Sequence, residues 1–518
     1  MRRAVAAAGA LTLTFLGVFG LASTASAAPI GGVGSIVSPD PVTSSIVVHK
    51  YVKSATNGLT AGDGTPTTPT GATLNGVTFK LQEVVTTPGN ASLDLLTNAG
   101  WTTASSIQSG WSSGAPTVLP AGYTLTAGTT QVTAGAGTAT FGTLHYGLYL
   151  VTEQTSPALP AGVIDPALPF LVTVPFPTGA AHPTNPNEWL YSVNVYPKNS
   201  ITGLTKVHNP VAVDAGFYTA GDYVSWTITS DVPSLVPAGS FNVYTVTDTI
   251  DPAQLTFATG GLPAGISPRS IKVLNSSSSD VTASFTLTTD YTFTISGASS
   301  ELQTLAFTAT GRTKLASLAQ GGKIVFVVPT QVVVIPASGT ITNQANSIVN
   351  SANLNVNDPV DFGQLRAFKY AMTDIAGTPT KTPLQGATFQ VYFDANTNGA
   401  ADPGELVTVN GVSSFTSDVT GVLNVTALKP GGYLLVETVA PVGYQLNATP
   451  HPVTVVAGTV VVGGANYIEI ANSQLPPWAL AFTGGNGVLM FTIAGGALMT
   501  VALGIALVAR RRRQATTD

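Results

Sequence analysis

Short runs of alternating apolar and polar residues fill most of the chain between its two ends. Clear examples are Ser45 to Val52, Gly147 to Glu153, Ser225 to Thr229 and Ile468 to Asn472. Clusters of Gly, Pro, Asn and Thr separate these runs. A period of two places alternate side chains on opposite faces of a strand, and frequent turn residues keep the strands short. The pattern predicts an all-β chain built from β-sandwich domains.

The two ends of the chain are apolar without alternation. At the N-terminus, Arg2 and Arg3 precede an apolar stretch from Ala4 to Leu21, and Ala25-Ser26-Ala27 follows it. A basic start, an apolar core and a small-residue site form a secretory signal peptide. The sequence therefore predicts cleavage after Ala27 and export of the mature chain.

At the C-terminus, an apolar run from Val488 to Ala509 is followed by four arginines, Arg510 to Arg513. At about 1.5 Å per helical residue, such a run just spans a bilayer core of roughly 30 Å. The positive-inside rule keeps the arginines in the cytoplasm. The run predicts a transmembrane helix.

Three domains are expected between these ends. The predicted segments are residues 1–27 for the signal peptide, 28–200, 201–357 and 358–474 for the domains, and 475–518 for the C-terminal tail. A chain of 518 residues has room for several separate cores. The stretch from Leu74 to Leu81 parallels that from Leu384 to Val391, which predicts the same fold for the first and third domains.

The composition of the chain argues against several classes of function. Charged residues make up 9% of the chain, the formal net charge is -5, and there is no cysteine. No basic patch for nucleic acid is therefore expected, and disulfides, thiol catalysis and thiolate metal sites are excluded. The five histidines lack metal-ligand spacing, and no nucleophile elbow or phosphate loop is found. The sequence does not predict an enzyme.

The residues before the apolar C-terminal run carry a specific signal, Leu480-Ala481-Phe482-Thr483-Gly484. It resembles the cell-wall sorting signal of Gram-positive surface proteins. That resemblance implies that a sortase cuts between Thr483 and Gly484 and holds the Thr483 carbonyl as an acyl-enzyme. Ala481 stands where the common motif has Pro, which leaves the sortase class open. An ordinary single-pass anchor is the alternative.

A second motif ends the first domain. Its fixed positions match the pilin motif of sortase-assembled pili, namely Trp189, Val193, Val195, Tyr196, Pro197 and Lys198. In that family the motif lysine attacks the acyl-enzyme, which here implies an amide between Lys198 of one copy and Thr483 of another. Strand parity predicts that Lys198 points away from the face of Trp189, within reach of an enzyme. A solvated strand-end lysine is the alternative.

The third domain carries a stretch from Tyr433 to Tyr444 that resembles the E-box of CnaB-type domains. The resemblance implies a spontaneous amide between Lys369 and Asn472, assisted by Glu437. Parity places each of the three among inward-facing apolar residues. Burial lowers a lysine pKa and raises a carboxyl pKa, which favours attack by a neutral amine. A buried ion pair with Asn472 as a bystander is the alternative.

Related sets are expected in the other two domains. The middle one resembles a CnaA-type domain, with Lys206, Asp248 and Asn343 as its set and Asn346 as the second choice for the amide. The first, CnaB-like domain offers Lys50, Glu153 and Asn199, and whether it closes its bond stays open because some pilins leave this domain uncrosslinked.

One loop of the third domain follows the spacing of an EF-hand calcium loop. The candidate ligands are Asp394, Asn396, Asn398, Ala400, Asp402 and Glu405, with Gly399 at the turn. No helical pattern flanks the loop, so it is either a calcium-binding loop between strands or a polar turn. No other cofactor is expected.

Together the motifs resemble those of the major shaft pilins of Gram-positive sortase-assembled pili, built from three tandem Ig-like domains. The implied partners are pilus-assembling and housekeeping sortases, other copies of the chain, peptidoglycan and an unidentified host receptor. The implied location is the cell surface, after transient membrane anchoring. A monomeric wall-anchored adhesin with the same domains is the first alternative, and a wall-anchored enzyme is the second.

Overall fold

The computed structural model describes most of the chain between the two terminal segments. The described residues are 36–37, 40, 42–54, 62–111, 119–155, 158–180, 182, 186–209, 223–235, 239–262, 266–375, 378–409, 411–475 and 496–507. The predicted signal peptide and Leu480 to Gly484 lie outside them.

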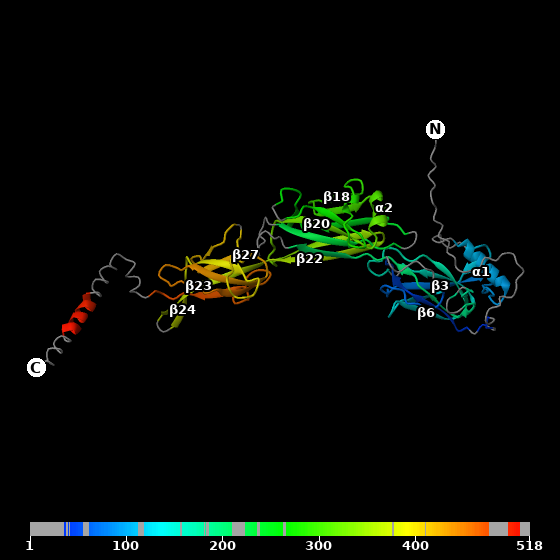
Figure 1. The fold of residues 1–518 in the computed structure, drawn as a ribbon, viewed down its shortest axis with the longest axis horizontal. Helices are drawn as coiled ribbons and strands as arrows, with labels where there is room; N and C mark the ends of the chain where they lie inside the picture. The colour runs from blue at the N-terminus through cyan, green and yellow to red at the C-terminus, as the bar shows by residue number, and fades with distance from the viewer. Residues whose placement is uncertain are drawn as a thin grey trace, which may run out of the picture.

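The prediction of an all-β chain is confirmed. The described residues form thirty strands, the α-helices α1 and α2, one short 3₁₀ helix and a further helical segment at residues 496–507. Figure 1 shows the strands in three groups that follow one another along the long axis of the molecule. We call these groups the first unit (β1 to β12), the middle unit (β13 to β22) and the third unit (β23 to β30).

The first unit has one larger sheet, one three-stranded sheet and two short pairs. The sheet orders are β4-β3-β7-β8 with β5 also on β3, β11-β1-β6, β10-β9 and β12-β2. The elements are β1 (Ser44–His49), β2 (Tyr51–Val52), β3 (Thr78–Thr86), α1 (Asn98–Gly110), β4 (Tyr123–Leu125), β5 (Thr129–Val132), β6 (Thr138–Leu144), β7 (Gly147–Glu153), β8 (Phe170–Val174), β9 (Phe176–Pro177), β10 (Trp189–Leu190), β11 (Ser192–Val195) and β12 (Lys198–Asn199).

Helix α1 was not predicted from the alternation. The hydroxyl of Thr97 caps its first turn by accepting a hydrogen bond from the Gly100 amide. Gly100, Ala104 and Ile107 recur at helical spacing and are buried. The helix thereby covers a second small core beside the main sandwich core of the first unit.

The middle unit packs two five-stranded sheets around the largest core. Their orders are β13-β14-β20-β16 with β17 also on β20, and β18-β19-β15-β21-β22. The elements are β13 (Leu204–Asn209), β14 (Tyr223–Asp231), β15 (Tyr244–Thr249), β16 (Leu255–Phe257), β17 (Ser270–Leu274), η1 (Thr282–Ser284), β18 (Tyr291–Ser296), β19 (Leu302–Phe307), α2 (Ala309–Leu318), β20 (Lys323–Val332), β21 (Thr340–Val349) and β22 (Ala352–Asp361). Strand β22 continues past residue 357, where the sequence placed a domain boundary.

The third unit has two four-stranded sheets around its own core. Their orders are β24-β23-β27 with β30 also on β23, and β26-β25-β28-β29. The elements are β23 (Gly363–Ile375), β24 (Thr378–Pro383), β25 (Thr388–Phe393), β26 (Phe415–Thr416), β27 (Val422–Leu428), β28 (Gly431–Val439), β29 (His451–Val455) and β30 (Tyr467–Ala471).

Backbone and side-chain contacts join the first unit to the middle unit. Ile164, from a loop of the first unit, is fully buried in the core of the middle unit. Its carbonyl accepts a hydrogen bond from the Ser351 amide at 3.2 Å. Beside it, the Asn350 side-chain amide donates to Asp165 at 2.8 Å. This loop therefore ties the two units together.

A close backbone approach joins the middle and third units. The Phe362 amide donates to the Gly339 carbonyl at 2.6 Å, and the Gly458 amide donates to the Phe362 carbonyl at 3.0 Å. Gly339 has a φ of +76°, and a Cβ there would lie 2.2 Å from Gly458 N and from Phe362 O. Only glycine fits at this position.

The C-terminal helix is described over residues 496–507. Within the described part of the chain, no helix reaches the length and apolarity needed to cross a membrane.

Candidate functional site

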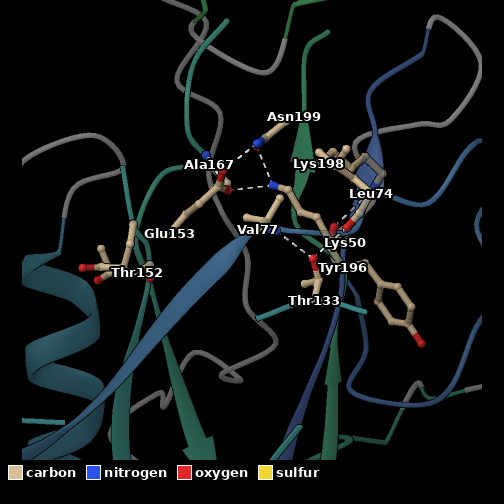
Figure 2. A network of polar contacts seen from close by, with 11 residues as sticks. Lys50, Leu74, Val77, Thr133, Thr152, Glu153, Ala167, Tyr196, Lys198 and Asn199 are labelled. Atoms are coloured by element: carbon tan, nitrogen blue, oxygen red, sulfur yellow. Dashed lines mark hydrogen bonds and ion pairs between the residues drawn. The ribbon is translucent and has the colours of Figure 1, made fainter. Parts of the chain in front are cut away.

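The first unit brings Lys50, Glu153 and Asn199 together in its interior. Lys50 Nζ donates to Glu153 Oε2 at 2.7 Å and to Asn199 Oδ1 at 2.5 Å. The Asn199 amide nitrogen donates to Glu153 Oε1, which closes a triangle. Figure 2 shows these three side chains pointing toward one another, with the neighbouring Lys198 outside the triangle. All three are buried.

The surroundings of Lys50 favour a neutral amine. Burial, helped by the positive charge of Lys198 and opposed by Glu153, lowers the pKa of Lys50 to about 8. The amine also lies over the ring of Phe79, 5.6 Å from its centroid. At neutral pH a useful fraction of this lysine is therefore unprotonated.

The middle unit holds the second set, again buried. Lys206 Nζ contacts Asp248 Oδ1 at 2.7 Å, and neither side chain is exposed. Burial raises the pKa of Asp248, which the neighbouring Lys206 opposes, and burial lowers the pKa of Lys206. Asn343 is fully buried, and neither of its amide atoms has a hydrogen-bond partner within the described residues. Asn346 instead bonds to Asn355 on the outer side of the sheet.

The third unit repeats the triangle of the first. Lys369 Nζ donates to Asn472 Oδ1 and lies 3.3 Å from Glu437 Oε1. The Asn472 amide nitrogen donates to both oxygens of Glu437, at 3.0 and 3.1 Å. Burial lowers the pKa of Lys369. Phe389 lies beneath the amine at 5.6 Å, as Phe79 does in the first unit.

The strands that carry these lysines and asparagines differ between units. In the first and third units they are parallel neighbours, with β12 beside β2 and β30 beside β23. In the middle unit, β13 and β21 belong to opposite sheets. A bond would therefore join adjacent strands in two units and cross the sandwich in the middle one.

Each triangle contains the groups that amide exchange needs. A neutral lysine amine can attack the asparagine Cγ, while the carboxyl group hydrogen-bonds to the amide and moves the proton to the departing nitrogen. One C–N bond forms, one breaks, and ammonia leaves. The sets therefore have the composition and contacts of a self-crosslinking centre.

Sequence reasoning missed the partners that orient the carboxyl groups. The Ala167 amide donates to Glu153 at 3.0 Å, and the Asn447 amide donates to Glu437 at 2.8 Å. Both donors lie in loops 14 and 10 residues after the glutamates. No local pattern marks a backbone amide, so only the fold reveals this role.

Lys198 lies next to the triangle of the first unit but outside it (Figure 2). Its side chain is partly buried, and its amine donates to the Tyr196 carbonyl at 3.4 Å. Burial lowers the pKa of Lys198, and the nearby charge of Lys53 adds to the effect. The strand is interrupted at Tyr191 and at Tyr196-Pro197, so counting alternate faces from Trp189 does not reach Lys198.

The other residues of the pilin motif pack against the first unit and fix the segment that leads to Lys198. Trp189 packs on Trp101 of helix α1, with ring centroids 5.3 Å apart. Val193 is buried and Val195 is partly buried in the main core. The Tyr196 hydroxyl accepts from the Thr67 amide at 2.6 Å. The motif therefore fixes the position of the segment that carries Lys198.

The predicted calcium loop folds around its own side chains. Asp394 accepts from the amides of Asn398 and Gly399, at 3.0 and 3.2 Å. Asp402 accepts from the side-chain amides of Asn396 and Asn398.

Glu405 is buried at the base of the same loop. One of its oxygens accepts from the Ala395 amide, and the other has no hydrogen-bond partner within the described residues. No group of three or more His, Cys, Asp or Glu side chains suited to a metal ion is found in the described part of the chain.

Two segments of the chain match known families. Residues 41–200 match the family described as Gram-positive pilin subunit D1, N-terminal domain, and residues 375–467 match the prealbumin-like fold domain. The first segment includes β1 and ends one residue after β12, so it contains the triangle of the first unit and the pilin motif. The second lies within the third unit.

Curated relatives align with the whole chain. Fimbrial subunit type 2 of Actinomyces naeslundii is 29% identical over 564 aligned residues, which cover 99% of this chain and 97% of that protein. Fimbrial subunit type 1 of Actinomyces viscosus is 28% identical over 570, covering 99% and 98%.

Solved pilin structures share the fold. The major pilin SpaD of Corynebacterium diphtheriae has a TM-score of 0.53 and 21% identity, covering 84% of this chain and 98% of that one. The fimbrial protein FimP of Actinomyces oris has a TM-score of 0.50 and 23% identity, covering 86% and 100%. The solved structures show the shared fold, while the matched domains and the curated fimbrial relatives identify the chain as a Gram-positive pilin and confirm the resemblance to shaft pilins seen in its motifs.

Proposed function

We propose that this pilin is polymerised by a sortase through an amide between Thr483 of one copy and Lys198 of the next, and that internal Lys–Asn amides stabilise each copy. The internal amides rest on the pair of closed triangles in the first and third units, where a buried lysine amine touches the asparagine that it would attack. The polymerisation rests on the pilin motif within the matched pilin domain and on the fimbrial relatives. The related set in the middle unit supports a third bond.

The termini complete the proposed pathway. The signal peptide exports the chain, and the apolar run before the arginines holds it in the membrane until a sortase cuts after Thr483. The last copy is passed to peptidoglycan by a housekeeping sortase, so the fibre is anchored to the wall. The three units act as tandem domains of residues 28–200, 201–361 and 362–474, with the second boundary moved to the end of β22.

The calcium proposal rests on the oxygen-rich loop from Asp394 to Glu405. Its carboxylate and amide oxygens, with the buried, unpartnered oxygen of Glu405, are ligands of the type that a hard cation such as Ca²⁺ prefers. A bound ion would stiffen the loop and has no part in bond formation.

Fibres on the cell surface test the polymerisation proposal. The wild-type chain should give a ladder that resists boiling in detergent, and a branched peptide joining Thr483 to Lys198 should be recovered from it by mass spectrometry. Lys198→Ala should abolish the ladder, while Lys53→Ala, which removes a neighbouring lysine, should keep it. A single band for the wild type would instead support a monomeric wall-anchored adhesin.

A further inference from the structure

A cluster of exposed aliphatic side chains lies at one end of the third unit. Val439, Val442 and Leu446 are 53%, 98% and 51% exposed, and all belong to the segment that follows the glutamate of the triangle. We call these three residues the apolar tip. Exposed aliphatic residues gathered in one loop point to a binding surface.

The loop that carries the apolar tip is fixed on two sides. The Leu475 amide donates to the Gly443 carbonyl, and the Gln445 amide donates to the Ser473 carbonyl, both at 2.9 Å. On the other side, the Asn447 amide donates to Glu437. Because the loop is already ordered, binding through it costs little conformational entropy.

The position of the tip along the chain indicates its partner. It is bonded to residues 473 to 475, and Thr483 follows Leu475 by only eight residues. Eight residues span at most about 28 Å when fully extended. In the proposed fibre, Leu475, to which the loop of the tip is bonded, is therefore held within about 28 Å of the Thr483 that joins Lys198 of the next copy.

Exposed apolar residues also lie near Lys198. Leu168 is 45% exposed and directly follows Ala167. The amides of Ala167 and Asn199 both donate to the carboxyl group of Glu153, and Asn199 is the residue next to Lys198. Leu168 is therefore only a few side chains away from the reactive lysine.

Val243 belongs to the same region, where the first unit meets the middle unit. It is 40% exposed, and its amide lies 3.3 Å from Asn350 Oδ1. Asn350 in turn binds Asp165, three residues before Leu168. We call Leu168 and Val243 the joint patch.

We propose that the apolar tip of one copy packs on the joint patch of the next copy in the fibre and orients the two copies around the Thr483–Lys198 bond. The inference rests on the proposed polymerisation. It adds a non-covalent contact between the third unit of one copy and the junction of the first two units of its neighbour.

The absence of cysteine from the chain allows a direct test. A Val442→Cys/Leu168→Cys double variant should form disulfides between copies when its fibres are oxidised, seen as a disulfide-linked peptide between the two positions. A Val461→Cys/Leu168→Cys variant is the control, because Val461 is 67% exposed but lies in the loop beside Gly458, at the opposite end of the third unit. That pair should stay reduced.

A substitution tests the energetic contribution. Val442→Asp should slow growth of the ladder about tenfold, as expected when one buried valine side chain is lost from a contact. Val461→Asp should grow at the wild-type rate. The branched Thr483–Lys198 peptide should still form in both variants.

The outcomes separate this inference from the proposed function. If the branched peptide forms but the Val442/Leu168 pair stays reduced and Val442→Asp grows normally, the contact does not exist and polymerisation stands. If the wild type yields no branched peptide at all, both the proposed polymerisation and the proposed contact are wrong.

Discussion

Replacing Glu437 by Gln tests whether the triangle of the third unit closes a covalent bond. Gln keeps the shape of the side chain but cannot take up the proton of Lys369. We expect the Lys369–Asn472 amide to be absent from the variant. Its intact mass should then lie closer to the sequence mass by about 17 Da, the mass of one ammonia that is no longer lost.

The loss of stability follows from the length of chain that the bond would close. Lys369 and Asn472 are 103 residues apart, so the chain-entropy model assigns the crosslink about 5 kcal/mol. The variant also leaves a buried lysine without its anion, which adds to the loss. For a unit of this size, the melting temperature should fall by roughly 20 °C or more.

The assay is differential scanning calorimetry of the full chain, combined with mass spectrometry of digested peptides. Glu469→Gln is the matched control in the same unit. Its partner Lys381 is 43% exposed on the side chain, so solvent screens the pair and the Lys369–Asn472 bond should be unaffected. Recovery of the Lys369–Asn472 branched peptide from Glu437→Gln at the wild-type yield would refute the role given to the carboxyl group.

Three further predictions follow from the same geometry. Asn343→Ala should remove the middle-unit crosslink and its mass deficit of about 17 Da, whereas Asn346→Ala should keep both. Branched peptides that contain Asn346 would show that Asn346, and not Asn343, forms the crosslink. In freshly synthesised chain, the rate of closure of the Lys50–Asn199 bond should rise about tenfold per pH unit up to about pH 8 and then level off. The reason is that the pKa of Lys50 in the folded chain is lowered to about 8. A rate that is flat across pH 6 to 8 would contradict this prediction. Ca²⁺ at 100 times its dissociation constant should stabilise the third unit by about 3 kcal/mol. This stabilisation should be lost in Asp394→Ala and kept in Asp418→Ala. Equal calorimetric traces with Ca²⁺ and with chelator would show that the loop binds no calcium.

Alternation along the strands was enough to place the three lysines. Lys50, Lys206 and Lys369 each share a face with apolar residues, and all three are buried. Parity works there because each lysine stands in or directly beside a regular strand, where side-chain direction repeats every two residues.

Strand parity does not apply where the backbone departs from a strand. The strands are interrupted at Tyr196-Pro197, just before Lys198, so the alternation does not extend to this lysine, whose amine donates to the Tyr196 carbonyl. Helices α1 and α2 escaped prediction because each is short and buries only two or three residues. Their starts were still marked, since Thr97 and Thr308 each cap the first turn.

The strand directions explain why the proposed bonds suit a fibre under tension. The chain enters the third unit along β23 and leaves it along β30, and these strands are parallel neighbours. Pulling on the two ends therefore shears the pair. With an amide between Lys369 and Asn472, the load passes from one strand to the other at the crosslink, and the residues between them carry none of it. The covalent bond thus replaces the hydrogen bonds that would otherwise fail first, and the apolar tip, bonded to residues 473 to 475 just beyond it, keeps its position for the neighbouring copy.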